Sequence, residues 1–260
     1  MLQASSTRET RESAREVKFL LTPAIAEKVR EWASARLGPD PYGSGSLGDE
    51  YKTTSLYFDT PQFAVYHRQG SYRRTKYRIR RYGAADVVFL ERKLRTSEML
   101  VKRRTTIPMA DLPLVAAETM DPTWAGRWFR QRVEARQLAP VCQVSYHRHA
   151  RVGHAQFGPL RLTFDDQIHV QSSGGLSFEP DAGVPVLQTH TVMEMKYRAV
   201  MPAILRHLVE EFSLAASAVS KYRLSMEAMK AAGLRAGASE VDLTQALQPH
   251  VIASEETRRA

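Results

Sequence analysis

The chain has 260 residues, with 37 Lys and Arg against 28 Asp and Glu, so its formal net charge is +9 at pH 7. This balance favours anionic partners, but it does not choose among nucleotides, polyphosphates, nucleic acids and acidic membrane surfaces. The single cysteine, Cys142, excludes an intrachain disulfide and a cysteine-rich zinc site, and no apolar run approaches the roughly 20 residues that span a bilayer. Because the start of the chain also lacks the apolar segment of a secretory signal, we expect a cytoplasmic protein.

The predicted elements begin after a polar tail over residues 1–14, which we expect to be disordered. Alternation of polar and apolar residues predicts eight strands, at residues 15–21, 51–59, 72–82, 86–95, 98–107, 140–151, 159–170 and 189–198. Apolar residues at helical spacing predict helices that begin at Thr22-Pro23, span 111–137, follow Pro202 and begin near Ser220. The polar segment 236–260 is expected to be a tail that is partly disordered or helical.

Many antiparallel strands with few helices predict an α+β fold, in which an eight-stranded antiparallel β-barrel forms a tunnel and carries helices packed on its outside. Residues 15–235 would form this single domain. The segment 38–50 is rich in Gly, Pro and Ser and is predicted to be a loop within it. No internal repeat interrupts this organisation.

One face of almost every predicted strand is charged, because residues two apart in a strand share a face. In the third strand Lys76, Arg78 and Arg80 oppose Tyr77 and Ile79. The same separation places these charged residues on one face of their strands: Glu16, Lys18, Glu91, Lys93, Lys102, Arg104, Arg148, Arg161, Asp165, Glu194 and Lys196. A solvated outer face explains any single strand, whereas the excess of cations across so many strands favours a barrel with its charged face inside.

An interior lined with Lys and Arg would suit a long, multiply charged anion such as triphosphate, since cations this dense repel one another unless an anion joins them. Carboxylates inside such a tunnel would repel phosphate unless they hold Mg²⁺ or Mn²⁺, which bridges carboxylate and phosphate oxygens. Glu194, in the stretch VMEMKY, is the first candidate for this role, and Glu16 and Glu91 are weaker candidates.

Nine stretches, in this order along the chain, resemble the VTC domain, the polyphosphate polymerase domain of the triphosphate tunnel metalloenzyme (CYTH-like) superfamily. They are EVKFLL (16–21), TSLYFDT (54–60), RTKYRIRRY (74–82), VFLERK (88–93), VKRR (101–104), SYHRHAR (145–151), RLTFDD (161–166), VMEMKY (192–197) and SKYR (220–223). Together they span nearly the whole chain, and the ordered set is more specific than any one stretch.

The resemblance implies that the γ-phosphate of ATP is transferred to a growing polyphosphate chain with the help of Mn²⁺ or Mg²⁺. By matched position it implies catalytic roles for Arg78, Arg80, Lys93 and Glu194, the last as the metal ligand. It implies substrate-binding roles for Lys18, Lys102, Tyr146, Arg148, Arg161, Lys196, Ser220 and Lys221. ATP and polyphosphate or pyrophosphate would be the partners, and regulation and export would need other proteins, including a membrane-protein partner.

Two other functions stay open from the sequence. One is a triphosphatase that hydrolyses tripolyphosphate or nucleoside triphosphates, and the other is a non-catalytic module that binds polyphosphate or another polyanion. Hydrolytic tunnel enzymes begin with E-x-E-x-K, whereas Ala14 stands here at the first glutamate position, before Glu16 and Lys18. Fewer carboxylates suggest one tightly held metal ion, which favours transfer over hydrolysis because a second metal can activate water.

The remaining signals favour structural roles. His147 and His149 share a face opposite Arg148, so a histidine metal site is not favoured. Cys142 lies in an apolar stretch and is expected to be a small core residue. Tyrosines lie among the basic residues, but no RNP-like motif accompanies them, so a specific nucleic-acid partner is not expected.

Overall fold

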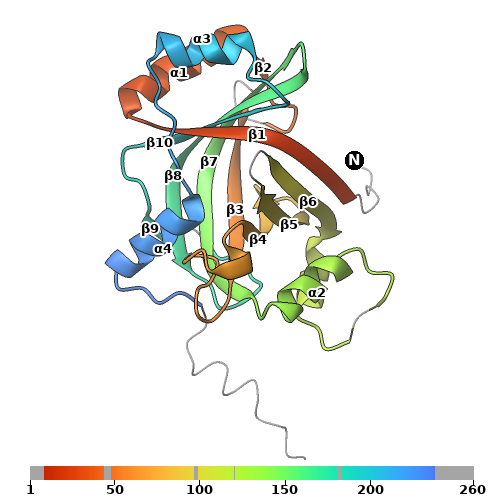
Figure 1. The fold of residues 1–260 in the computed structure, drawn as a ribbon. Helices are drawn as coiled ribbons and strands as arrows, with labels where there is room; N and C mark the ends of the chain where they lie inside the picture. Colours follow the sequence, from red (N-terminus) through yellow and green to blue (C-terminus); the bar gives the residue numbers. More distant parts are fainter. Residues whose placement is uncertain (1–8, 44–47, 97–98, 120, 181–182, 238–260) are drawn as a thin grey trace, which may run out of the picture.

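Eight antiparallel strands close into a ring in the computed structural model, which describes residues 9–43, 48–96, 99–119, 121–180 and 183–237 (Figure 1). In ring order they are β7 (Ala139–Ala155), β3 (Glu50–Asp59), β4 (Thr75–Tyr82), β5 (Val87–Arg95), β6 (Leu100–Pro108), β1 (Glu9–Leu21), β10 (Thr191–Tyr197) and β8 (Gly158–Ser172). Pairing of β8 with β7 closes the ring. The two-residue strands β2 (Gly38–Pro39) and β9 (Val184–Pro185) pair with β7 and β8. The predicted closed barrel is confirmed.

Each of the eight predicted strands corresponds to one strand of the ring, but β1 begins earlier than predicted. Residues 9–14, expected to be disordered, instead pair with β6, from Glu9 opposite Thr105 to Ala14 opposite Leu100. The expectation is wrong because composition does not record backbone pairing: the edge of β6 offers N–H and C=O groups that a polar strand can satisfy as well as an apolar one. Residues 1–8 and 238–260, which include most of both predicted tails, lie outside the described residues.

The described chain contains four α-helices: α1 (Pro23–Arg36), α2 (Arg127–Ala135), α3 (Ala203–Glu211) and α4 (Lys221–Ala231). Three begin where the sequence predicts. Pro23 lies in the first turn of α1 and Pro202 immediately precedes α3, positions where a missing N–H costs no helical hydrogen bond. Ser220 caps α4, and its Oγ accepts a hydrogen bond from the Arg223 N–H at 3.4 Å. None of these helices is long and apolar enough to cross a membrane.

The helix predicted over 111–137 is wrong in its middle. A 3₁₀ helix, η2 (Met109–Val115), takes the first part, and α2 begins only at Arg127. Pro122 and Gly126 lie between them. Proline disrupts a helix interior and glycine weakens it, so the apolar spacing of Trp124 and Trp128 spans two separate elements.

The apolar faces of the strands point outward and pack under the helices. Phe19, Leu162 and Met193 from β1, β8 and β10 form one buried cluster with Trp32 of α1 and Leu205 of α3, and Figure 1 shows these two helices lying together over that part of the barrel. Burial of each large apolar side chain contributes about 1.5–3 kcal/mol. Since the outer faces form the core, the charged faces are left to meet inside the ring.

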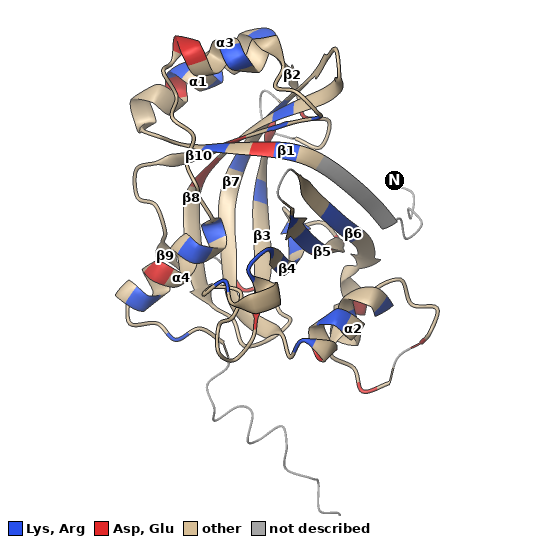
Figure 2. Ribbon diagram, viewed as in Figure 1, with Lys and Arg blue, Asp and Glu red and all other residues tan. Residues whose placement is uncertain are grey.

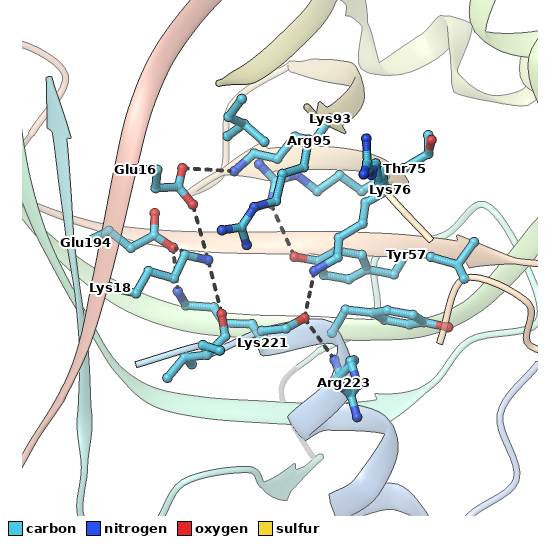
Figure 3. Close-up of a pocket in the computed structure, with 18 of the residues that line it drawn as sticks. Glu16, Lys18, Tyr57, Thr75, Lys76, Lys93, Arg95, Glu194, Lys221 and Arg223 are labelled. Carbon is cyan, nitrogen blue, oxygen red and sulfur yellow. Dashed lines mark hydrogen bonds and ion pairs between the residues drawn. The ribbon is translucent and has the colours of Figure 1, made fainter. Parts of the chain in front are cut away.

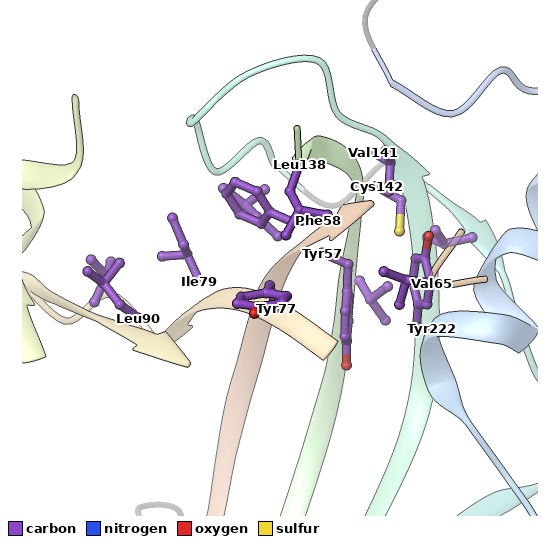
Figure 4. Packing of buried hydrophobic residues seen from close by; sticks show 14 of the residues in the cluster. Tyr57, Phe58, Val65, Tyr77, Ile79, Leu90, Leu138, Val141, Cys142 and Tyr222 are labelled. Atoms are coloured by element: carbon purple, nitrogen blue, oxygen red, sulfur yellow. The ribbon is translucent and has the colours of Figure 1, made fainter. Parts of the chain in front are cut away.

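A second apolar cluster covers β3, β4, β5 and β7 (Figure 4). It includes Tyr77, Ile79 and Leu90 from the strands, and Tyr222 from α4. Cys142 is fully buried in this cluster, as expected of a core residue. Burial raises the pKa of its thiol, which keeps the sulfur protonated and unreactive.

Asp59, at the end of β3, joins this cluster to the loop that follows the strand. Its buried carboxylate accepts hydrogen bonds from the backbone N–H groups of Thr60 (2.7 Å), Val65 (2.8 Å) and Tyr66 (2.9 Å). The Tyr222 hydroxyl donates a fourth hydrogen bond to it at 2.5 Å. One side chain therefore ties α4 to the segment that leads from β3 to β4.

Candidate functional site

The inward faces of the strands, together with the start of α4, line a cavity of about 760 Å³ (Figure 3). Its carboxylates are Glu16 and Glu194. Against these two it has thirteen basic side chains: Lys18, Arg68, Arg73, Arg74, Lys76, Arg78, Arg80, Lys93, Arg95, Arg148, Lys196, Lys221 and Arg223. Figure 2 shows how such basic positions recur on the strands and in the first turn of α4. The charged faces therefore do meet inside the barrel.

The cavity brings together ten of the twelve side chains that the sequence singles out. They are Lys18, Arg78, Arg80, Lys93, Tyr146, Arg148, Glu194, Lys196, Ser220 and Lys221. They come from β1, β4, β5, β7, β10 and α4, so only the closed ring places them together. The remaining two, Lys102 and Arg161, do not line it.

Lys102 and Arg161 sit on the expected strands. Lys102 of β6 is in register with Lys93 of β5. Arg161 pairs with the buried carboxylate of Asp40 and donates a hydrogen bond to the Tyr51 hydroxyl at 2.5 Å. The Tyr51 ring meets Tyr82 edge to face, 5.5 Å between centroids. Arg161 thus belongs to a polar and aromatic layer next to the cavity, and its role toward substrate stays a prediction.

Glu194 lies at the centre of a lysine cluster. Its Oε1 is 3.3 Å from the Lys18 Nζ and 3.2 Å from the Lys221 Nζ, and its Oε2 is 3.6 Å from the Lys196 Nζ. Burial raises the pKa of Glu194, but the positive charges of Lys18 and Lys221 outweigh this effect and hold the pKa well below its ordinary value. The carboxylate is therefore charged throughout the physiological range.

Glu16 adds a second carboxylate from the neighbouring strand. Its Oε1 is 3.2 Å from the Lys18 Nζ, whereas its Oε2 lies 3.6 Å from Lys93 and 3.9 Å from Lys196 and has no hydrogen-bond partner. Burial and the charge of Glu194 raise the pKa of Glu16, but the surrounding lysines lower it to about 2. A buried carboxylate oxygen without a hydrogen bond, next to another carboxylate, fits a divalent cation that prefers oxygen ligands.

Glu91 does not fit a metal ligand, although the sequence makes it a weaker candidate. Its Oε2 accepts a hydrogen bond from the Arg78 Nε at 2.6 Å, and its Oε1 accepts one from the Arg104 Nε at 2.7 Å. Burial raises the pKa of Glu91, but the two guanidinium groups hold it well below its usual range. Glu91 instead fixes the orientation of Arg78 beside the cavity.

Asp165, which the sequence analysis places on the charged face without a role, positions two predicted phosphate ligands. It accepts hydrogen bonds from the Arg148 Nε (2.6 Å) and Nη2 (2.7 Å), and the Lys221 Nζ is 2.5 Å away. Arg148 and Arg80 in turn donate to the Tyr146 hydroxyl, at 3.3 Å and 2.8 Å. Buried charges of this kind need fixed partners, and these partners hold the donors in place before any anion arrives.

Lys76 also reaches the cavity, and its Nζ donates a hydrogen bond to the Ser220 Oγ at 2.7 Å. Burial lowers the pKa of this ammonium, and the nearby charges of Lys18 and Arg78 lower it further, to about 7. Burial likewise lowers the pKa of Lys93 and Lys196. These lysines therefore lose their protons more readily than a solvated lysine does, and an incoming anion would favour their protonation.

We expect the affinity for tripolyphosphate to fall by roughly tenfold as the pH rises from below to above 7, because Lys76 then has to take up a proton on binding. Below pH 7 the ammonium is already charged, so no proton is taken up there. Titration calorimetry in buffers of different ionisation enthalpy measures both the affinity and the number of protons taken up on binding. In Lys76→Arg the guanidinium stays charged at every pH in this range, so the variant's affinity changes with pH only through the phosphate. The difference between the pH profiles of wild type and variant therefore reports on Lys76. An unchanged pH profile in Lys76→Arg would contradict this assignment.

Several cavity residues were missed by the sequence analysis, for two reasons. Alternation places Lys76 of β4 and Asp165 of β8 on the charged faces but gives neither a role; Lys76 lines the cavity, whereas Asp165 pairs with the cavity residues Arg148 and Lys221. Arg68 lies in the connection between β3 and β4, outside every predicted strand, and Arg73 lies in the same connection because β4 begins at Thr75 rather than at residue 72. Only the fold places that connection at the cavity.

Among the residues that the structure describes, the histidines do not form a metal cluster with one another. His149 instead approaches Glu50, 3.4 Å from its Nδ1 to the Glu50 Oε1, and both lie near Asp49. The Asp49 carboxylate is paired with Arg151 at 2.8 Å. We assign no metal to this group.

The fold and the cavity together define the class of protein. The structure has a closed eight-stranded antiparallel barrel with a cationic interior and inward-facing glutamates, which is the tunnel that the sequence resemblance implies. A family model described as VTC domain matches residues 13–230. The chain therefore belongs to the VTC domain family, as its ordered motifs suggest.

Solved structures match this chain at low sequence identity, and the first of them, with a TM-score above 0.5, shares its fold. A candidate adenylate cyclase from Bacillus halodurans has a TM-score of 0.51 and 14% identity, and the match covers 81% of this chain and 95% of that one. A candidate adenylyl cyclase from Hippeastrum, with a dominant triphosphatase activity, has a TM-score of 0.46 and 15% identity over 86% and 97% of the two chains. A Pyrococcus horikoshii protein has a TM-score of 0.46 and 14% identity over 83% and 99%. No curated protein matches the chain.

Proposed function

We propose that this protein is a metal-dependent polyphosphate polymerase, which transfers the γ-phosphate of ATP to a polyphosphate chain inside the barrel. The observation that carries the proposal is the cavity inside the barrel, with thirteen basic side chains and two carboxylates, in a chain of the VTC domain family. A condensed phosphate chain carries a charge on every unit and no bulky side groups. It therefore suits a cavity whose basic residues recur along neighbouring strands.

The basic residues would bind and orient both reacting phosphates. Glu91 and Asp165 already hold Arg78 and Arg148 in place, so these guanidinium groups need little reorganisation when phosphate enters. Arg80 and Lys93 add donors from β4 and β5. Ser220 and Lys221 would add donors from the start of α4, where the backbone N–H groups of the first turn also favour an anion.

Glu194 and Glu16 are the residues that would hold Mn²⁺ or Mg²⁺. Such a cation, when bound, would neutralise phosphate charge and orient the oxygens that it shares with the carboxylates. Lys18 and Lys196, which pair with both glutamates, would then be available to phosphate oxygens. The identity of the metal is part of the proposal.

The reaction needs positioning more than covalent help from the protein. A terminal oxygen of the acceptor chain forms a bond to the γ-phosphorus, the bond from that phosphorus to the β,γ-bridging oxygen breaks, and ADP leaves. Arg78, Arg80 and Lys93 would stabilise the negative charge that spreads over the transferred group. The barrel wall limits access of water, which competes with the acceptor chain for the same phosphoryl group.

We expect purified protein, incubated with ATP and Mn²⁺, to form chains longer than pyrophosphate, with one ADP released for each phosphate added. Added pyrophosphate should remove any lag, because it supplies the first acceptor. Electrophoresis that resolves chain length, with ADP measured in parallel, tests this. Free phosphate without chains would replace the proposal with a triphosphatase. No turnover of ATP or tripolyphosphate, together with tight polyphosphate binding, would leave a binding module.

Three further parts of the hypothesis stay predictions. They are the domain limits at residues 15–235, the cytoplasmic location and a membrane-protein partner for regulation or export. The family match over residues 13–230 lies close to the first of these.

A further inference from the structure

Five arginines of the cavity form a group of their own, apart from the predicted phosphate ligands: Arg68, Arg73, Arg74, Arg95 and Arg223. The first four are exposed and Arg223 is half-buried, whereas the predicted basic ligands in the cavity are buried or half-buried. We call these five residues the rim arginines. Their exposure shows that they lie where the cavity opens to solvent.

The rim arginines continue the inner rows of basic residues toward solvent. Arg74 lies two positions before Lys76, and Arg95 two positions after Lys93, so each extends the inward face of its strand by one step. The Arg95 N–H donates to the Arg74 carbonyl at 2.8 Å, which keeps these two positions side by side. Figure 3 shows Arg95 reaching into the space that Lys93 also faces. An anion that fills the inner cavity can therefore run on to the rim.

The backbone that carries Arg68 is held in a fixed conformation. Arg68 has a positive φ of 58°, which is uncommon for a residue other than glycine. Asp59 fixes the preceding turn through Val65 and Tyr66, and the Gln69 N–H closes it on the Ala64 carbonyl at 2.9 Å. Such a conformation persists only where its surroundings enforce it, and such positions cluster at functional sites.

The rim arginines differ from the inner cations in their partners. Lys18, Arg78, Arg148 and Lys221 each pair with a buried carboxylate. In the described part of the chain, no carboxylate pairs with Arg68, Arg73, Arg74 or Arg95, and Arg223 makes only a 3.8 Å contact with Glu227. The Arg223 Nε is buried without a hydrogen-bond partner. These guanidinium groups are thus available to an anion from outside.

We propose that the rim arginines form an outer anion subsite, which holds the part of a polyphosphate chain that extends beyond the inner cavity. The protein would therefore bind long chains more tightly than tripolyphosphate. This inference rests on the proposed function, because it requires the inner cavity to hold condensed phosphate. Polyphosphate fits better than an oligonucleotide, since it runs from the cavity to the rim without bases that the barrel would have to admit.

The test compares two triple variants of the full chain that lose the same total charge. The rim variant is Arg73→Ala/Arg74→Ala/Arg95→Ala. The control variant is Arg127→Ala/Arg132→Ala/Arg206→Ala, which removes exposed arginines of α2 and α3. The affinities for tripolyphosphate, for size-fractionated long polyphosphate and for a single-stranded oligonucleotide are measured without ATP. All six positions are exposed, and melting curves verify that both variants fold.

We expect the rim variant to bind the long chain roughly tenfold more weakly, because three exposed charge contacts are lost together. Its affinity for tripolyphosphate should change less than twofold. Its binding of the long chain should also depend less on salt. The control variant should change neither affinity appreciably. A long chain can bind in many alternative registers, and comparing the two variants on the same ligand cancels this statistical advantage. Equal losses for both ligands, equal losses in both variants, or no loss would each overturn the subsite.

Two further outcomes separate this inference from the proposed function. If tripolyphosphate does not bind at all, the inner assignment of the proposed function fails and the inference fails with it, whereas normal tripolyphosphate binding with no loss of long-chain affinity in the rim variant overturns the inference alone. If the oligonucleotide binds as tightly as long polyphosphate and loses as much in the rim variant, the rim is a general polyanion surface and the inference is wrong.

Discussion

Replacing Glu194 with Gln should reduce turnover by roughly 10²–10³-fold or more, because the substitution removes the central carboxylate of the proposed metal site. The fold should persist, since Lys221 keeps its pair with Asp165 and Lys18 keeps its pair with Glu16. The measurement is the rate of ADP release from ATP with saturating Mn²⁺, together with the product lengths. Glu134→Gln on α2 is the matched control and should keep the wild-type rate.

A second readout separates a metal role from a purely structural one. Without divalent metal, Glu194→Gln should bind tripolyphosphate at least as tightly as wild type, because it takes a negative charge out of a cationic cavity. If this variant also loses metal-free binding, Glu194 serves to organise the lysines rather than to hold a cation. Full turnover in the variant would refute the metal assignment altogether.

Asp59→Ala should cost about 3–5 kcal/mol of folding free energy and lower the melting temperature by roughly 10 °C. The substitution leaves three backbone N–H groups and the Tyr222 hydroxyl without their shared acceptor in a buried site. Chemical denaturation followed by far-UV circular dichroism measures the loss. A cost below about 1 kcal/mol would mean that water replaces the carboxylate, contrary to its complete burial.

Tyr222→Phe is the graded control for this prediction. It removes only the fourth hydrogen bond and keeps the ring stacked on Tyr57, 5.2 Å between centroids, so the expected cost is about 1–2 kcal/mol. Because Asp59 ties α4 to the loop before β4, Asp59→Ala should also weaken phosphate binding through Lys221, in protein that is still folded. The cost of Tyr222→Phe should therefore be a fraction of the cost of Asp59→Ala.

The eight strands of the ring were predictable from sequence because alternation in a strand leaves only two faces. The apolar faces of β1 and β10 pack against α1 and α3 on the outside of the barrel, so their charged faces must point into the interior. This reasoning places Lys18 and Glu194 correctly inside the ring. It cannot place a residue along the barrel axis, because depth depends on strand stagger, and so Arg161 falls in the neighbouring layer with Tyr51 and Asp40.

Contacts that follow no periodic pattern could not be predicted from the sequence. Asp59 collects its donors from a turn and from a helix that lies 163 residues further along the chain. The extension of β1 over residues 9–14 depends on a free edge of β6, which composition does not record. The break between η2 and α2 was present in the sequence as Pro122 and Gly126, and it was outweighed by the spacing of the tryptophans.

The pairing of β7 with β8 has a consequence for any polymer inside the barrel. With that pairing in place, each strand of the ring is hydrogen-bonded to two neighbours, with β1 paired to β6 over residues 9–14 and to β10 over residues 15–21. A linear chain inside can escape sideways only if a whole ladder of hydrogen bonds opens, whereas sliding along the barrel axis breaks none of them. Successive additions would then occur on the same captive molecule, and synthesis would be processive as a matter of topology rather than of affinity.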